Sequence, residues 1–348
     1  MVNKINVEAP AVVKLFGEHA VIYGKLSIAA ALKIYARSSV EKIDDNKFEI
    51  ELKDLNKYKE FSNEDLESIY ENYIKKEDYD SFIRSQNIDS EILPYAVIAG
   101  KIRKTRNISI TNIKVIIKSD IPIQKGLASS AACSTAFTVA LLKYFNINLP
   151  DKEVIELARE GDKIIHRNDN AGRIDVSTSY YGGYVSYSVD TGAKKENIDN
   201  IVGLMLIDTG PKKSTAETVN HVAMLYKENK SKTEEILCEI EKCSRDGLSS
   251  LKENNLIKLG ELMYKNHELL ANLGVSSEGL ENAVHIVKRN NGFGAKLSGG
   301  GGGGLAIALL NNRASDKLIN DLKSYNYSIS TADISLDGAK MFINTNPN

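Results

Sequence analysis

Three features that the chain lacks exclude several classes of protein. Its three cysteines, Cys133, Cys238 and Cys243, form no CxxC pair and have no histidine at metal-ligand spacing, which excludes a disulfide framework and a zinc site. No long uncharged apolar run is present, so we expect no membrane span. The net charge is −1, from 45 basic and 46 acidic residues, so no global field favours nucleic acid or an anionic membrane.

The length and composition are those of a globular protein. With 348 residues, 42% of them hydrophobic and 26% charged, the chain is long enough for two domains with separate apolar cores and a cleft between them. The first ten residues contain no apolar core followed by a small-residue cleavage site, so they do not resemble a signal peptide. We therefore expect a cytoplasmic protein.

The first part of the chain predicts strands and one insertion. Residues 4–15, 27–35 and 38–50 alternate or become apolar, which favours strands. Residues 44–91 are strongly charged and their helical periodicity is interrupted. This segment indicates an exposed, partly helical insertion in the first domain.

The later elements divide the chain into two domains. Expected helices cover 93–104, 131–144, 151–166, 215–228, 232–246, 256–273 and 277–289, and expected strands cover 113–119, 203–208 and 304–310. A last pair of elements follows. Because the pattern changes after Gly183, we expect an N-terminal domain over 1–190 and a C-terminal domain over 191–348.

Two loops have the composition of phosphate-binding sites. The loop from Pro122 to Ala132 leads directly into an apolar helix, so its backbone N–H groups and the helix dipole converge on one point. An ordinary serine-rich helix cap is the alternative. The second loop has six consecutive glycines, Gly299–Gly304. Because each glycine loses much backbone freedom on folding, this run predicts that a ligand or the other domain approaches the backbone closely.

A third motif lies at the end of the first strand. Gly17-Glu18-His19 places a carboxylate and an imidazole side by side at the strand's tip, where polar groups can orient a substrate. By itself, such a pair is also compatible with an ordinary surface.

Together these three segments resemble the GHMP kinase superfamily, and the segment from Phe16 to Gly24 is similar to the mevalonate kinase form of the first motif. Further similarities follow in order: Gly172–Asp175 with Ser177-Thr178, Asp208-Thr209-Gly210 with Lys213-Ser214-Thr215, and Asn266–Leu270. These ordered motifs extend the resemblance over nearly the whole chain.

The resemblance implies a fold and an activity. The fold is α/β (α+β), with an N-terminal ribosomal-S5-like domain, a C-terminal ferredoxin-like domain and the active site in the cleft. The activity is ATP- and Mg²⁺-dependent phosphorylation of the 5-hydroxyl of mevalonate, a small-molecule substrate, with no nucleic-acid or membrane partner. A homodimer stays open. So do two other functions: a kinase of a mevalonate phosphate, such as mevalonate 3-phosphate 5-kinase or phosphomevalonate kinase, and a non-catalytic paralogue that binds ATP or a metabolite.

The resemblance also implies roles for single residues. Asp175 corresponds to the general base beside the acceptor hydroxyl. The Mg²⁺ ligands would be Ser130 and a carboxylate that we align with Asp162, but two residues are inserted between His166 and Asp175, so Glu160 competes for this role. The implied substrate-binding residues are Glu18, His19, Thr215 and Arg173, and the implied ATP-binding residues are Lys125, Gly126, Leu127, Ala128, Ser129, Ser130, Ala131, Gly299, Gly300 and Gly301.

One departure from the family pattern concerns the cation beside the acceptor oxygen. The lysine that is usual two residues after Pro10 is replaced by Val12. Side chains at i and i+2 of a strand share a face, about 6.6–6.8 Å apart along the chain. We therefore expect Lys14 to take the catalytic role, with a structural or exposed lysine as the alternative.

Two further departures concern the loops. Ala128 stands where glycine is usual, and because a Cβ disfavours positive φ, we expect ordinary backbone angles there. Arg167 and Arg173 flank the inserted residues, and guanidinium groups suit phosphate. They keep an already phosphorylated substrate open, although such arginines also commonly face solvent.

Overall fold

A pair of long antiparallel strands, β1 (Lys4–Phe16) and β2 (Ser27–Lys42), forms the centre of the first domain in this computed structural model. The structure describes residues 4–122, 125–200, 202–210, 214–310 and 314–343. The register of the pair shifts twice, and the second shift lies between Lys14 and Phe16. Because such irregularities bend a strand and redirect its side chains, the backbone around Lys14 departs from a regular ladder.

The first sheet has eight strands in the described part of the chain, in the order β12-β1-β2-β5-β3-β4, with β6 paired to β2 and β7 paired to β6. Its other strands are β3 (Phe48–Leu52), β4 (Lys57–Phe61), β5 (Ile113–Ser119), β6 (Tyr184–Ser188), β7 (Gly192–Glu196) and β12 (Lys340–Met341). The expected strands over 27–35 and 38–50 are instead one continuous strand, β2, followed by β3. β2 stays extended because β1 pairs with one of its edges while β5 and β6 pair with the other.

The segment 44–91 differs from the expected exposed insertion. β3 lies inside the sheet, paired with both β4 and β5, and its Phe48 and Ile50 are fully buried. The segment continues with α1 (Asn63–Ile74) and α2 (Tyr79–Ser85). Only one face of these elements contacts the core, and the other face is charged. The charged residues therefore make the composition of the whole segment resemble that of a solvent-exposed insertion.

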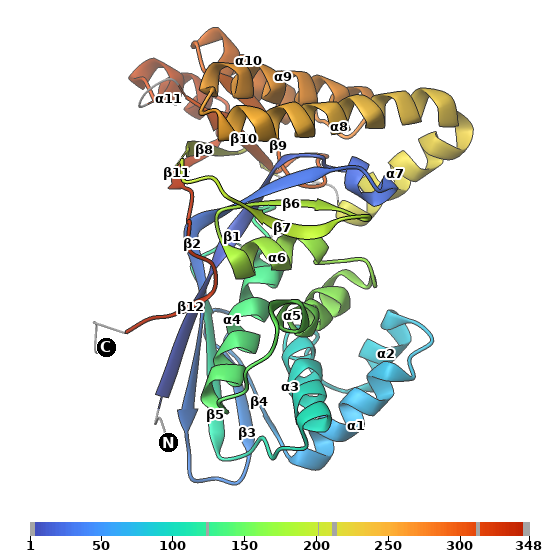
Figure 1. Ribbon diagram of the computed structural model, residues 1–348, viewed down its shortest axis with the longest axis vertical. Helices are drawn as coiled ribbons and strands as arrows, with labels where there is room; N and C mark the ends of the chain where they lie inside the picture. Colours follow the sequence, from blue (N-terminus) through green and yellow to red (C-terminus); the bar gives the residue numbers. More distant parts are fainter. Residues whose placement is uncertain (1–3, 123–124, 201, 211–213, 311–313, 344–348) are drawn as a thin grey trace.

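Helices cover one face of the large sheet (Figure 1). They are α3 (Leu93–Arg106), α4 (Ser129–Tyr144), α5 (Asp151–His166) and α6 (Arg173–Tyr181). α4 packs against β1 and β2, and its interior residues are buried on all sides, which explains its uniformly apolar sequence. Two short 3-10 turns, η1 (Ala20–Tyr23) and η2 (Lys53–Leu55), complete this domain.

The second domain has a four-stranded antiparallel sheet among the described residues, in the order β11-β8-β10-β9. Its strands are β8 (Gly203–Asp208), β9 (Gly294–Leu297), β10 (Leu305–Leu309) and β11 (Ser328–Asp333), and its helices are α7 (Thr215–Glu228), α8 (Lys230–Lys252), α9 (Leu256–Asn272), α10 (Glu278–Arg289) and α11 (Asp316–Lys323). The expected two-domain α/β architecture is confirmed.

The chain crosses between the two sheets after the expected boundary. Residue 190 lies in the turn of the β6–β7 hairpin, and the second sheet begins at β8. After β11 the chain returns, because Ile334 bridges to Leu32 and β12 pairs with β1 (Figure 1). The second domain is therefore connected to the first at both of its ends, because the chain enters it after β7 and returns to the first sheet after β11.

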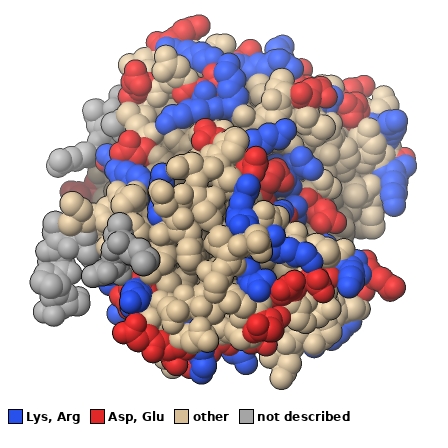
Figure 2. Space-filling model, turned by 60° about the horizontal axis from the view of Figure 1, so that its bottom comes forward, with Lys and Arg blue, Asp and Glu red and all other residues tan. Residues whose placement is uncertain are grey.

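Basic and acidic side chains are interspersed on the face seen in Figure 2, as expected from the balanced net charge. Within the described residues, every helix is too short or too polar to cross a membrane.

Candidate active site

A cavity of about 690 Å³ lies where the two domains meet. The first domain contributes most of its wall, including Lys14 of β1, the loop after Pro122 and Asp175 of α6. The second domain contributes Thr215, at the start of α7, and two residues of the glycine run. Segments that are far apart in the sequence thus form one wall.

Lys14 and Asp175 form an ion pair in this cavity. Lys14 Nζ lies 2.9 Å from Asp175 Oδ2, and each side chain is about one fifth exposed (21%). Burial alone would lower the pKa of the Lys14 ammonium, but the charge and hydrogen bond of Asp175, with the charges of Glu18 and Asp162, together outweigh burial and raise it. Lys14 is therefore a fixed cation beside a carboxylate. The side chain of Val12, on the same wall, packs in an apolar cluster with Ile174.

Ser130 and Asp162 meet on the wall of the same cavity. Ser130 Oγ donates to Asp162 Oδ1 at 2.6 Å, and His166 Nε2 lies 3.3 Å from the same hydroxyl. Burial raises the pKa of Asp162, which is only 2% exposed. A buried carboxylate next to a hydroxyl is a set of hard oxygen donors that fits Mg²⁺.

Glu160, the competing carboxylate, lies elsewhere. It is buried and accepts hydrogen bonds from Tyr73 (2.6 Å), Lys101 (2.6 Å) and Lys163 (3.3 Å). It is not among the residues that line the cavity. Through these partners Glu160 connects α5 to α1 and α3, so its contacts stabilise helix packing and do not contribute to the cavity.

The serine-rich loop leads into α4 through a left-handed residue. Ala128, at the N-cap of α4, has φ +51° and ψ +44°, so the expectation of ordinary backbone angles was wrong. The loop is tied to the sheet by the N–H of Val12, which donates to the Leu127 carbonyl at 3.0 Å. The turn at this point requires positive φ, and the alanine adopts it at a cost of about 1–2 kcal/mol. All the loop residues implied for ATP line the cavity, except Ala131, the third residue of α4.

The glycine run faces this loop from the second domain. A Cβ built on Gly299 would lie 4.0 Å from the Cα of Gly126, so the two loops oppose each other. Gly299 and Gly300 line the cavity, whereas Gly301 has φ +75° and packs against the Val275 carbonyl. The sequence predicted that another group approaches the backbone of the glycine run closely. At Gly301 this group is the protein's own backbone, at Val275.

Several implied ligand-binding residues already have protein partners. The side chain of Glu18 is 1% exposed and forms an ion pair with fully buried Lys296. His19 Nε2 lies 2.9 Å from the Gly300 carbonyl oxygen, and burial lowers the pKa of this imidazole to about 4, so it is neutral. Lys125, which lines the cavity, has its Nζ 2.6 Å from Asp208 Oδ2 of the second domain.

The two arginines that flank the inserted residues differ in their relation to the cavity. Arg173 is exposed and contacts Asn170 at 3.3 Å. Arg167 does line the cavity, but its Nε lies 2.6 Å from Asp80 of α2. Ile123, Gln124 and Lys213 belong to the quoted motifs and lie outside the described residues.

The sequence pattern missed part of the wall. The segment 44–91 contributes Leu52, Asp54, Leu55 and Ile83, although its charged composition predicted a solvated surface. Ser298, which exchanges two hydrogen bonds with the backbone of Lys14, was also missed. The signal for Ser298 was its place as the last polar residue before the glycine run.

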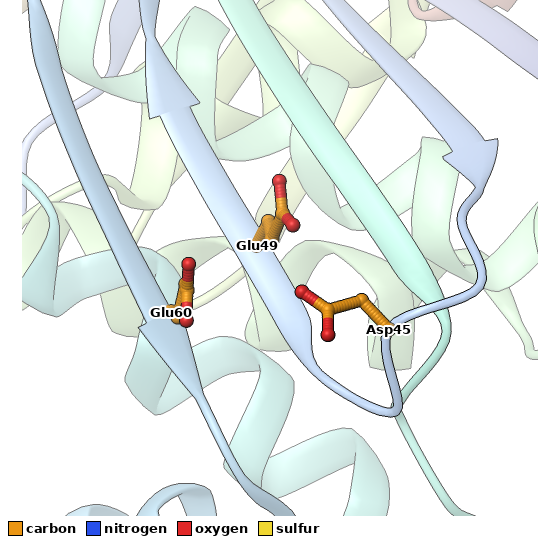
Figure 3. Close-up of side chains that lie close together, drawn as sticks. All are labelled: Asp45, Glu49 and Glu60. Atoms are coloured by element: carbon orange, nitrogen blue, oxygen red, sulfur yellow. The ribbon is translucent and has the colours of Figure 1, made fainter.

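A separate group of carboxylates, Asp45, Glu49 and Glu60, lies on the outer part of the large sheet (Figure 3). Lys47 forms an ion pair with Glu60, and Lys114 lies 3.9 Å from Glu49. These lysines balance the acidic charge, and the group lies outside the cavity described above.

Comparisons with known proteins agree with the motifs. Two family models match the chain: GHMP kinases N terminal domain over residues 93–183, and GHMP kinases C terminal over residues 248–328. The mevalonate kinase of Methanocaldococcus jannaschii is 33% identical over 321 residues, which cover 91% of this chain and 95% of that protein. The mevalonate kinase of Pyrococcus horikoshii is 32% identical over 322 residues, 90% of each protein.

Solved structures show the same similarity. The crystal structure of the Methanococcus jannaschii mevalonate kinase superposes with a TM-score of 0.78 at 29% identity, covering 95% of this chain and 98% of that one. The structure of L. major mevalonate kinase in complex with R-mevalonate has a TM-score of 0.75 at 23% identity, which is a likeness of fold. The sequence identity, the two family models and the shared fold together establish that this chain belongs to the GHMP kinase family.

Proposed function

We propose that this protein transfers the γ-phosphoryl group of ATP to the 5-hydroxyl of mevalonate. The observation that carries the proposal is the Lys14–Asp175 ion pair, 2.9 Å long, on the wall of the interdomain cavity. The 33% identity to an archaeal mevalonate kinase over most of both chains supports mevalonate rather than a mevalonate phosphate as acceptor.

In the proposed reaction, Asp175 accepts the proton of the acceptor hydroxyl as its oxygen forms the new bond to phosphorus. The bond between the γ-phosphorus and the bridging oxygen of ADP breaks, and that oxygen leaves with the negative charge. Lys14 stabilises the charge that develops on the acceptor oxygen, and its ammonium group holds the Asp175 carboxylate in place beside it.

The phosphates would lie at the N-terminus of α4. The opposed loops around Gly126 and Gly299 present backbone groups to the cavity, and the helix dipole favours negative charge there. Ser130 and Asp162 would hold Mg²⁺, which neutralises phosphate charge during transfer. Thr215 and Gly300 lie next to each other. In this proposal both residues lie beside the phosphoryl group that is transferred.

Glu18 and His19 act in this proposal through position rather than through a free charge. Glu18 is neutralised by Lys296, and His19 is neutral and bonded to Gly300. Neither residue lines the cavity, and both lie in the turn that follows β1, so in this proposal they hold the end of the strand that carries Lys14.

The proposal is tested by measuring ADP release with a panel of acceptors. Mevalonate, mevalonate 3-phosphate, mevalonate 5-phosphate, a sugar and an amino-acid alcohol are compared at equal concentrations of ATP and Mg²⁺. We expect kcat/KM to be highest for mevalonate. A preference for a phosphorylated acceptor, or no acceptor-dependent ADP release, would refute the proposal.

A further inference from the structure

The outer edge of β1 at Lys14 is completed by a side chain of the other domain. Ser298 Oγ accepts a hydrogen bond from the Lys14 N–H at 3.1 Å and lies 3.2 Å from the Lys14 carbonyl oxygen, to which it donates. Ser298 is only 4% exposed. A backbone donor and acceptor at a buried strand edge need partners, and here one hydroxyl serves both.

This contact is one of three made by alternate residues from Lys296 of β9 to Gly300. Lys296 forms the buried ion pair with Glu18, Ser298 holds the backbone of Lys14, and the Gly300 carbonyl contacts His19. Lys296 and Ser298 are two residues apart, as expected for side chains on one face of an extended segment, and the backbone then turns at Gly299, which has φ +85°. One edge of the second domain therefore holds the strand end that contains Lys14 and the turn that follows it.

The place of this contact matters because the strand is irregular there. Lys14 pairs with Ala29 of β2, but the register shifts directly after it, before Phe16, so the regular ladder holds the strand on one side of Lys14 only. Ser298 fixes the backbone of the lysine while Asp175 holds its ammonium group at 2.9 Å. The two contacts come from different domains.

We propose that Ser298 is a positioning residue for Lys14: its hydroxyl fixes the strand edge so that the ammonium group points at Asp175 and the acceptor oxygen. This inference rests on the proposed kinase function. It also assigns to the segment before the glycine run a role separate from phosphate binding.

The test begins with Ser298→Ala, which removes both hydrogen bonds and leaves the glycines unchanged. We expect kcat with mevalonate to fall roughly ten- to a hundredfold, because a misplacement on the order of 1 Å has effects of that size. The dissociation constant for ADP with Mg²⁺, measured by calorimetry, should change less than twofold. Ser298→Thr keeps the hydroxyl and should recover most of the rate.

The matched control is Ser244→Ala. Ser244 is fully buried in the same domain, and its hydroxyl donates to the Ile240 carbonyl at 3.1 Å, away from the cavity. A comparable loss of thermal stability in both variants, with a fall in kcat only for Ser298→Ala, separates positioning from general destabilisation. Should Ser298→Ala not fold, Ser298→Cys, whose thiol is a weak donor and acceptor, takes its place.

A double-mutant cycle with Lys14→Met then tests the route of action. If Ser298 acts through Lys14, the double variant should be no slower than Lys14→Met alone, whereas independent effects would multiply. Multiplying effects, or a normal kcat in Ser298→Ala while Lys14→Met is inactive, would overturn this inference and leave the kinase proposal standing. Lack of mevalonate-dependent ADP release in the unmodified protein would instead refute the proposed function itself.

Discussion

At the scale of single residues, the charge of Asp175 is the feature on which the proposed chemistry depends most. Asp175→Asn keeps the shape of the side chain but removes the negative charge that accepts the proton. We expect kcat to fall by roughly two to four orders of magnitude, as for the loss of a general base. Binding of ADP with Mg²⁺ should persist. Steady-state turnover within a factor of three of the unmodified protein would remove Asp175 from the mechanism.

Asp162 and Glu160 offer a paired test of the Mg²⁺ assignment, because both are buried carboxylates on α5. Asp162→Ala should raise the Mg²⁺ concentration for half-maximal rate severalfold, since a hard cation loses one of its few protein oxygens. Glu160→Ala should lower the melting temperature by leaving Lys101 without its partner, at unchanged Mg²⁺ dependence. The reverse pattern, in titrations of rate against Mg²⁺, would contradict the assignment.

The sequence predicted some of these residue positions and not others. Lys14 follows from the period of two in a strand, and its partner Asp175 from a resemblance to known motifs. The left-handed Ala128 was not predictable, because the intrinsic preference of alanine is overridden by the turn into α4. The ion pair of Lys296 with Glu18 joins residues 278 positions apart, and no local pattern encodes such a contact.

At the scale of elements, the turn after β1 and the glycine run meet through His19. Its folded pKa of about 4 lies below the ordinary value of 6.5, so the unfolded chain binds more protons between these pH values. The stability from neutral His19 is therefore complete above pH 6.5 and is lost as the pH falls toward 4. We expect the free energy of unfolding, measured with urea, to fall less between pH 7 and pH 5 in His19→Gln than in the unmodified protein. An identical loss in both proteins would contradict this.

The glycine run is expected to be constrained by the protein's own backbone at one position. Gly301 has φ +75°, and an added Cβ would lie 2.0 Å from the Val275 carbonyl oxygen. Gly192 has a similar φ of +68° but open space around it. Gly301→Ala should therefore lose about 1–3 kcal/mol more unfolding free energy than Gly192→Ala, the range for overpacking. Equal losses in denaturant unfolding would show that only the backbone angle matters.

Most elements were predictable from periodicity, and the failures have a common cause. α4 and α5 were expected almost to the residue, because each has an uninterrupted helical pattern. β4 was missed and β3 was expected only as far as Ile50, because one face of each is charged, so pairing of β3 with β4 and β5 had to supply what composition obscured. α6, which carries Asp175, was also missed, since its short sequence is buried on most sides and lacks a strong polar face.

At the scale of the whole molecule, the cavity exists only because two domains meet along several tethers. Lys125 pairs with Asp208, Ser298 holds Lys14, and β12 returns to β1. No such long-range contact could be predicted from the sequence pattern, although the two domains themselves could. The proposed site thus forms only when both domains have folded and packed together. The product of the reaction is the most direct measure of whether this site works as proposed.

The central claim is tested most directly by proton-coupled ³¹P NMR of the product formed from ATP, Mg²⁺ and mevalonate. A phosphate on the 5-oxygen is bonded next to a CH₂ group, so its signal should be a triplet that grows in equal amount to ADP. A phosphate on the tertiary 3-oxygen would give no such triplet, and inorganic phosphate would indicate simple ATP hydrolysis. The account predicts the triplet, and either of the other two signals as the main product would contradict it.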